Sequence, residues 1–141
     1  MKRTGSAVWT GGLKDGKGRL STESGALADA PYSFARRFGD EAGTNPEELI
    51  GAAHAACFAM ALSAVLGEHG MTAEELSATS AVTVVAVEGG FAITKAHLTL
   101  RARIPGADAE AFRKAAEGAK AGCPVSKVLN AEITLDAALD A

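Results

Sequence analysis

The stretch that decides the fold covers residues 45–70 and reads NPEELIGAAHAACFAMALSAVLGEHG. Asn45 can cap a helix by accepting a hydrogen bond from its opening amides. Pro46 fits the first helical position, because that position has no intrahelical use for an amide hydrogen. Glu48 stands three residues after Asn45 and completes a capping box. We therefore expect a helix over residues 46–66, about 30 Å long at 1.5 Å per residue and ended by the glycines that follow.

This predicted helix is apolar on nearly every side. Between Leu49 and Val65 only His54 can carry a charge, and the run approaches the length of a membrane span. Much of it is alanine, however, so its transfer into lipid is less favourable than that of a leucine-rich span. We interpret it as a helix buried in protein, with no membrane partner. One sheet face cannot enclose such a helix in a small domain, so we expect a partner subunit to supply the remaining cover.

The composition is that of a soluble globular protein, and we expect residues 1–141 to form a single domain. The chain has 141 residues, with 14 Lys and Arg against 17 Asp and Glu. This length suffices for a core without disulfide or metal staples, which excludes disordered proteins and disulfide scaffolds. The sequence has no block of like charges, so it lacks the charge pattern typical of proteins that bind nucleic acid. The basic start lacks the apolar stretch of a secretory signal, so we expect a cytoplasmic protein.

Strands are predicted on both sides of the helix. Residues 1–42 contain short apolar alternations separated by a turn at residues 15–18. This pattern predicts a small antiparallel meander, which residues 34–38 continue. After the helix, alternation over residues 80–87 and 91–104 predicts a hairpin.

Two more helices and a closing strand complete the predicted order. Residues 108–121 form an amphipathic pattern that predicts a helix. Gly122-Cys123-Pro124 opens a short helix through about Leu129, and residues 132–139 alternate as a last strand. The sequence therefore predicts the α+β class.

The two cysteines are the candidate nucleophiles. Nucleotide-binding, α/β-hydrolase and metalloprotease motifs are absent, so the chemistry left is that of thiols, and we expect no cofactor. Cys57 lies inside the predicted helix, where a buried cysteine can also be an inert hydrophobe. Cys123 precedes Pro124 at a predicted helix start, where exposed amides favour a thiolate. By spacing alone, Cys123 is the more activated of the pair.

His54 provides an alternative to thiol catalysis. It lies three residues before Cys57 on the same helix face, and with Cys123 these residues could supply three metal ligands. A structural zinc site needs a fourth ligand, and no CxxC is present, so His54 can equally be a hydrogen-bonded core residue. The alternative function is thus a redox-inactive or metal-holding dimeric module.

Residues 43–58 (GTNPEELIGAAHAACF) and residues 122–126 (GCPVS) resemble the OsmC/Ohr family of thiol peroxidases, and more closely its OsmC (osmotically inducible protein C) branch. The resemblance covers essentially the whole chain. It implies antiparallel sheets wrapped around a long central buried helix in an intertwined homodimer. It also implies a stress-defence enzyme that reduces hydroperoxides, organic ones preferentially and hydrogen peroxide less well.

The resemblance also implies roles for four residues. Cys57 matches the family's peroxidatic cysteine and Cys123 its resolving cysteine, which captures the Cys57 sulfenic acid as an intramolecular disulfide. Arg37 and Glu47 match the arginine and glutamate that attend the reactive sulfur. The arginine before Arg37 and the glutamate after Glu47 leave both assignments open by one residue. The family's reductant is typically a lipoyl-protein dithiol.

The chemistry of Cys57 places a demand on its surroundings. Desolvation in mid-helix raises a thiol pKa, so a cation must offset it, and Arg37 oriented by Glu47 is the candidate. Glu47 and Cys57 are ten positions apart, which is about 15 Å of rise and about 80° of rotation on one helix. We therefore expect Glu47 to come from the partner chain, or the helix to break between the two. An apolar cleft would favour alkyl hydroperoxides. Three residues could line such a cleft or could simply pack in the core: Phe34, Phe58 and Met60.

Overall fold

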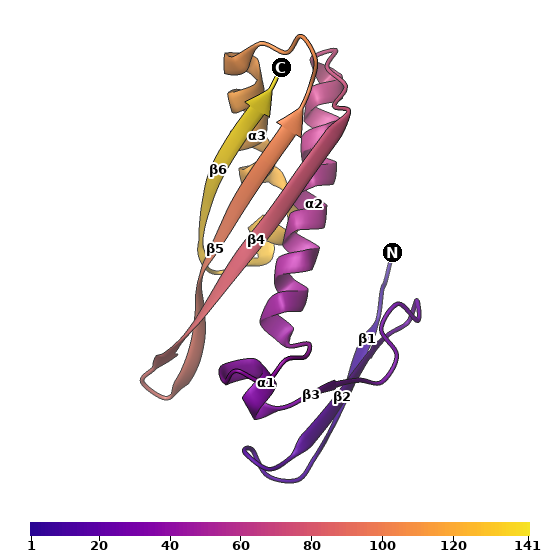
Figure 1. Cartoon of the computed structure of the whole chain (residues 1–141), viewed down its shortest axis with the longest axis vertical. Coiled ribbons are helices and arrows are strands. Elements are labelled where there is room, and N and C mark those ends of the chain that lie inside the picture. Colours follow the sequence, from indigo (N-terminus) through magenta and orange to yellow (C-terminus); the bar gives the residue numbers. More distant parts are fainter. The chain divides into compact units, whose positions relative to one another are not determined.

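The computed structural model describes all 141 residues, and the chain divides into two compact units, residues 1–49 and 50–141. The boundary falls in the first turn of helix α2 (Pro46–Glu68), which runs without a break. Each unit has a three-stranded sheet of its own (Figure 1). The expected α+β class, with sheets and one long helix, is confirmed.

The first unit is built on an antiparallel sheet in the order β1-β2-β3. β1 (Gly5–Thr10) pairs with β2 (Lys17–Thr22), and β2 pairs with β3 (Ala30–Tyr32). The rings of Trp9 and Tyr32 pack with their centroids 5.6 Å apart. The predicted meander is therefore present.

Residues 34–38 do not continue the meander, and that prediction is wrong. They form the short helix α1 (Phe34–Phe38), and the third strand is β3 instead. The Ser33 hydroxyl accepts a hydrogen bond of 3.2 Å from the Arg36 backbone amide, which caps the helix. The rings of Phe34 and Phe38 lie 5.2 Å apart at a spacing of four residues. These apolar residues therefore follow the helical period rather than the strand period.

The second unit contains a mixed sheet in the order β4-β5-β6. β4 (Glu75–Val87) and β5 (Gly90–Arg103) form the predicted antiparallel hairpin, whereas β6 (Glu132–Asp140) runs parallel to β5. The parallel direction arises because α3 (Ala109–Gly122) and α4 (Pro124–Val128) carry the chain back along the sheet before β6 begins. The sequence predicts the order of these elements but not the direction of the last strand.

The core of the second unit lies between one face of this sheet and the helices α2 and α3. Its largest buried side chains are Phe58, Leu62, Leu66, Leu98, Leu100, Ile104 and Phe112. By length and composition alone α2 could cross a membrane, but core helices of soluble proteins pass the same test. The burial of Phe58, Leu62 and Leu66 against the sheet is that of a core helix.

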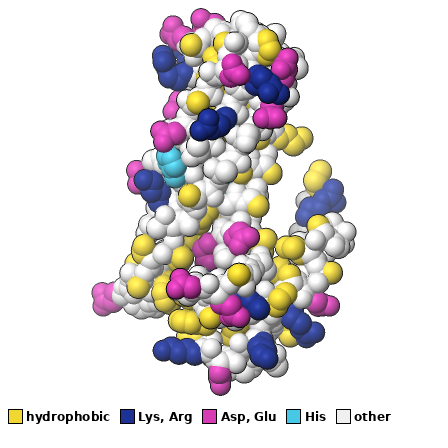
Figure 2. All heavy atoms as spheres, viewed as in Figure 1, with side chains coloured by type: hydrophobic (Ala, Val, Ile, Leu, Met, Phe, Trp, Pro, Cys, Tyr) yellow, Lys and Arg dark blue, Asp and Glu magenta, His cyan; other side chains and the backbone are white.

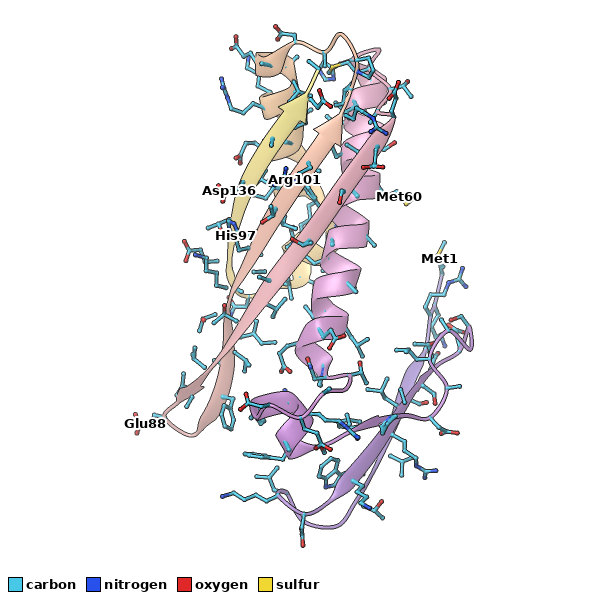
Figure 3. All side chains as sticks on the ribbon, viewed as in Figure 1. Met1, Met60, Glu88, His97, Arg101 and Asp136 are labelled. Carbon is cyan, nitrogen blue, oxygen red and sulfur yellow. The ribbon has the colours of Figure 1, made fainter.

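The opposite face of α2 is exposed in the single chain. It is a stripe of small residues with one long side chain, Met60, which is 80% exposed and projects away from the sheet (Figure 3). We call this face the α2 stripe; it consists of Ala52, Ala53, Ala56, Met60, Ser63, Ala64 and Gly67. One chain therefore encloses only one side of the helix.

The outer face of the second sheet is polar. His97 of β5 makes contacts of 2.6 Å from Nδ1 to Thr134 Oγ1 and 3.2 Å from Nε2 to Asp136 Oδ2, both on β6. Figure 3 shows His97 and Asp136 near each other on this face, with Arg101 further along β5. In the space-filling view, basic and acidic side chains are interspersed (Figure 2). This face is therefore a solvated surface of mixed charge.

Gly51 allows α2 to approach β4 closely. A Cβ atom at this position would lie 2.7 Å from the backbone carbonyl oxygen of Ser80. Because that neighbour is backbone, no side-chain rotation can make room, and a larger residue would force the helix and the strand apart.

We predict that Gly51→Ala lowers the free energy of unfolding by about 1–3 kcal/mol, because overpacking outweighs the better helix propensity of alanine. The matched control is Gly118→Ala in α3, where nothing lies within 4 Å of the added Cβ. That change should raise the free energy of unfolding by about 0.5–1 kcal/mol. Urea unfolding followed by circular dichroism measures both, and equal effects of the two substitutions would contradict the role of Gly51.

Candidate active site

The two cysteine thiols meet in the second unit. Cys57 lies in the middle of α2, and Cys123 is the residue that caps the start of α4. Both are free thiols; Cys123 is fully buried and Cys57 partly buried. They lie close enough for each thiol to shift the pKa of the other. The fold therefore brings together two thiols that are distant in the sequence.

The start of α4 holds both sulfur atoms. The Cys123 Sγ accepts a hydrogen bond of 3.4 Å from the Ser126 backbone amide, in the place where a serine or aspartate oxygen usually caps a helix. Pro124 occupies the first helical position, as its missing amide hydrogen favours. The backbone of Val125 in the same turn acts to lower the pKa of the Cys57 thiol. The backbone of this short helix thus fixes the approach of the two thiols.

The two thiols differ in their electrostatic environment. Burial raises the pKa of the Cys57 thiol, and the neighbouring Cys123 raises it further, against partial opposition from the Val125 backbone. Burial also acts to raise the pKa of Cys123, but hydrogen bonds from Ser126 and Cys57 outweigh it and leave that pKa lowered. The expectation that Cys123 is the more activated thiol by its own surroundings is confirmed. Nothing within the second unit supplies the cation that an ionised Cys57 requires.

His54 lies fully buried between two hydroxyl groups. Its Nδ1 is 2.8 Å from Ser80 Oγ, and its Nε2 is 2.8 Å from Ser126 Oγ. Burial lowers the pKa of this histidine, so the imidazole is neutral at neutral pH. Both ring nitrogens are occupied, and no group of three His, Cys, Asp or Glu side chains is arranged to hold a metal ion. The metal-holding alternative therefore lacks a ligand set.

The second predicted pair, Arg37 and Glu47, forms an ion pair in the first unit. Arg37 donates from Nε to both Glu47 oxygens, at 3.0 and 3.2 Å, and from Nη2 to Oε1 at 2.8 Å. The Glu47 side chain is only 8% exposed, and that of Arg37 is 37% exposed. The guanidinium also lies over the Phe38 ring, 5.0 Å from its centroid. These contacts orient the guanidinium.

The neighbouring arginine and glutamate are engaged elsewhere. Arg36 pairs with Glu41 at 3.6 Å. The Glu48 backbone amide donates to Asn45 Oδ1 at 2.8 Å, and the Asn45 side-chain nitrogen donates to Glu48 Oε2 at 3.3 Å. These contacts confirm the predicted helix start. Of the four residues, only Arg37 and Glu47 form an ion pair with each other.

The thiol pair and the ion pair belong to different units of the chain. The sequence allowed two ways for Glu47 to serve Cys57, a break in the helix or a contribution from a partner chain. Because α2 is continuous, about 15 Å of helix rise separates the two residues. A helix break is therefore excluded.

The expected apolar cleft is not assembled from the three residues suggested for it. Phe58 is fully buried in the core, and Met60 projects from the α2 stripe. Phe34 instead lines a cavity of about 300 Å³ in the first unit, next to Arg37. The other apolar side chains of this cavity are Trp9, Leu13, Tyr32 and Phe38.

Two serines of the site were missed by the sequence analysis. Ser126 lies inside the GCPVS segment, three residues after Cys123, at the spacing that returns to the cap of a helix. Ser80 occupies a half-buried position of β4 in line with Ala78 and Val82. A hydroxyl among inward-facing apolar residues needs a polar partner. The place of Ser80 among such residues was therefore the sequence signal that could have identified it.

Comparison with known proteins decides the family. A sequence model described as OsmC-like protein matches residues 39–138. The chain belongs to the OsmC family. It is 56% identical over 136 residues to the peroxiredoxin OsmC of Escherichia coli (strain K12), covering 96% of this chain and 95% of that protein.

More distant relatives support the assignment to the OsmC family. The organic hydroperoxide resistance protein of Xanthomonas axonopodis pv. citri (strain 306) is 35% identical over 137 residues, covering 94% of this chain and 92% of that protein. The crystal structure of the organic hydroperoxide resistance protein OhrB of Bacillus subtilis superposes with a TM-score of 0.69 at 27% identity, covering 96% of this chain and 98% of that one. The matched OsmC region contains Glu47, Cys57 and Cys123, and begins two residues after Arg37.

The lowered pKa of His54 predicts a pH dependence of stability. Above about pH 6.5 the imidazole is neutral in both the folded and the unfolded chain. Below that pH the unfolded chain binds a proton that the folded chain does not, so the free energy of unfolding falls by up to about 1.4 kcal/mol per pH unit until the lowered folded pKa is reached. His54→Gln should remove this part of the slope.

Urea unfolding of the reduced protein between roughly pH 7.5 and 5 measures the slope. His69→Gln, which changes an exposed histidine, is the control and should keep the wild-type slope. A wild-type slope in His54→Gln would show that His54 does not bind its proton on unfolding as described.

Proposed function

We propose that this protein reduces organic hydroperoxides to alcohols, and hydrogen peroxide less well, with Cys57 as the attacking thiol and Cys123 as the resolving thiol. The observation that carries the proposal is the contact between two free thiols, one of them fully buried, at the start of α4. The names of the relatives, a peroxiredoxin and an organic hydroperoxide resistance protein, support it. As an OsmC protein with this dithiol, the chain is a thiol-dependent peroxidase.

The reaction proceeds in three balanced steps. The Cys57 thiolate attacks the terminal oxygen of the hydroperoxide, the O–O bond breaks, and the alkoxide takes a proton and leaves as an alcohol. The resulting Cys57 sulfenic acid is attacked by Cys123, which forms the disulfide and releases water. An external dithiol then reduces this disulfide and becomes a disulfide itself. No metal or cofactor takes part.

Arg37 supplies the positive charge in this mechanism. Burial raises the pKa of Cys57, so the thiolate requires a nearby cation. The guanidinium of Arg37 is always charged and is held along its Nε–Nη2 edge by Glu47, and we assign a further N–H of the group to a peroxide oxygen. The Arg37–Glu47 pair thus stabilises the thiolate and orients the substrate.

The pair acts on the cysteine of a partner chain, in a homodimer. The α2 stripe supports this arrangement, because an exposed helix face made of small residues allows the close approach of a second helix. The unbroken helix between Glu47 and Cys57 supports it as well. Each dimer then contains two sites, each with a dithiol from one chain and an ion pair from the other.

The cavity beside Arg37 supports the preference for organic substrates. It is lined mainly by aromatic and aliphatic side chains and has a volume of about 300 Å³, which suits an alkyl or aryl group next to a charged peroxide-binding nitrogen. We place the reductant among lipoyl-protein dithiols, as the family resemblance implies. Two unpaired cysteines suit a reducing compartment, and we place the protein in the cytoplasm.

One equivalent of cumene hydroperoxide should convert the reduced protein to a form lacking two hydrogens, in which a disulfide joins the peptides that contain Cys57 and Cys123. Mass spectrometry of the intact and digested protein measures this. Cys57→Ser should not react, whereas Cys123→Ser should gain oxygen at Cys57 and form no intramolecular link. Wild-type protein that remains unmodified under these conditions would refute the peroxidase mechanism.

Complementation between inactive chains tests the shared site. Cys57→Ser and Glu47→Gln homodimers should each have little activity. A heterodimer made by co-expression has one site with both Cys57 and Glu47 intact if the residues come from different chains. A statistical mixture should then regain about a quarter of wild-type turnover.

The control for complementation is a single chain that carries both substitutions, co-expressed with Cys57→Ser. Neither chain of that pair has a thiol at position 57, so none of its dimers should turn over hydroperoxide. No recovery in the first mixture, together with dimers of normal stability, would refute the assignment of Glu47 to the partner's site.

A further inference from the structure

The resolving thiol has no direct access to water. Cys123 is fully buried, yet it must give up its proton to attack the Cys57 sulfenic acid and must regain one when the disulfide is reduced. Either transfer needs a group inside the protein that can hold a proton for a short time.

A continuous line of hydrogen bonds leads away from this thiol. The Cys123 Sγ lies 3.5 Å from Ser126 Oγ, which lies 2.8 Å from His54 Nε2. On the other side of the ring, His54 Nδ1 lies 2.8 Å from Ser80 Oγ. Ser126 and His54 are buried and Ser80 is half-buried, so the line runs from the interior towards the surface at β4.

The chemistry of a neutral imidazole gives this line a direction. One ring nitrogen donates and the other accepts. With Cys123 as a thiol, its S–H donates to Ser126, the Ser126 hydroxyl donates to Nε2, and Nδ1–H donates to Ser80. With Cys123 as a thiolate, the Ser126 hydroxyl donates to the sulfur and Nε2–H donates to Ser126. Every buried member keeps a partner in both states, which avoids the cost of an unpaired polar group.

We propose that His54 is a positioning residue for Cys123: through the Ser126 hydroxyl it takes up the Cys123 proton when the disulfide closes and returns a proton when the disulfide opens. This inference rests on the proposed function of the dithiol and adds to it a route for the proton. His54 touches neither sulfur in this route, since Ser126 makes the contact with Cys123.

The proton balance of both steps closes. On closure, the Cys123 proton passes to Ser126 while the Ser126 proton passes to His54; the S–S bond forms and the S–O bond of the sulfenic acid breaks. The departing hydroxide takes a proton back along the same route and leaves as water. On reduction, one thiol of the external dithiol loses its proton and attacks the Cys57 sulfur; Cys123 departs as a thiolate and receives that proton along the route. The second thiol of the dithiol then displaces Cys57, and the dithiol becomes a disulfide.

The surroundings of His54 suit a temporary proton acceptor. The groups that face it are the hydroxyls of Ser80 on β4 and Ser126 on α4, with the titratable thiols of Cys57 one turn along α2 and Cys123 beyond Ser126. Burial is the cause of its lowered pKa, and no charged side chain contributes. The ring is thus neutral before the reaction and can accept a proton.

Single-turnover kinetics separate this role from a structural one. Reduced protein is mixed with cumene hydroperoxide, and the oxidation of Cys57 and the closure of the disulfide are followed separately by rapid quenching and mass spectrometry over a range of pH. His54→Gln should leave the rate of Cys57 oxidation within about two-fold and slow closure by on the order of 100-fold, with a flattened pH profile. The exposed control His69→Gln should leave both rates and both profiles unchanged.

Ser126→Ala provides the second variant, which also decides the question if His54→Gln does not fold. It should slow closure to a similar extent, and the double variant should be no slower than the worse single variant, since both residues lie on one route. Wild-type closure rates and pH profiles in Ser126→Ala, or equal slowing of oxidation and closure in both variants, would overturn the proposal.

A measurement without peroxide distinguishes failure of this inference from failure of the proposed function. In the Cys57→Ser background, the ultraviolet absorbance of the thiolate reports the ionisation of Cys123 alone. Ser126→Ala should shift the midpoint of that ionisation to higher pH. An unshifted midpoint overturns the route, whether or not the wild-type protein reacts with hydroperoxide.

Discussion

The close approach of α2 and β4 at Gly51 is the contact on which the thiol site depends. With no side chain at this position, the backbones of helix and strand come near enough for the imidazole one turn later to reach the Ser80 hydroxyl. The same helix then presents Cys57 to the start of α4, where Cys123 and Ser126 lie. A displacement of α2 would thus disturb the histidine and both sulfur atoms together.

The electrostatics of the two units are complementary. Burial acts to raise the pKa of both thiols in the second unit, but hydrogen bonds outweigh it at Cys123 and leave only the pKa of Cys57 raised. The first unit contains Arg37, which lines an apolar cavity and pairs with an almost completely buried carboxylate. The thiol pair and the ion pair thus belong to different units of the chain.

Much of the fold follows from local sequence signals. Asn45, Pro46 and Glu48 define the start of α2 through backbone geometry and hydrogen bonding, and the β4–β5 hairpin follows from its alternation. The short helix α1 was missed because two phenylalanines four residues apart resemble strand residues when the cap at Ser33 is overlooked. The direction of β6 depends on how α3 and α4 pack, which is a tertiary property.

The site, like the fold, is only partly predictable from the sequence. Cys57, Cys123, Arg37 and Glu47 were suggested by resemblance, and their pairwise contacts are present in the structure. The histidine was noted as a possible ligand, but its two serine partners come from a distant strand and helix, and no local pattern connects them. Partnerships between residues so far apart in the chain become visible only when the sheet and its crossover are in place.

The parallel pairing of β6 with β5 has a consequence for biogenesis. A parallel strand pair cannot form until the intervening crossover has docked, so the last strand to be synthesised completes the second sheet. The sulfur of Cys123 is carried on that crossover and reaches its counterpart only as the crossover settles. In a newly made chain the two thiols therefore behave as independent groups until this crossover has been synthesised and has docked.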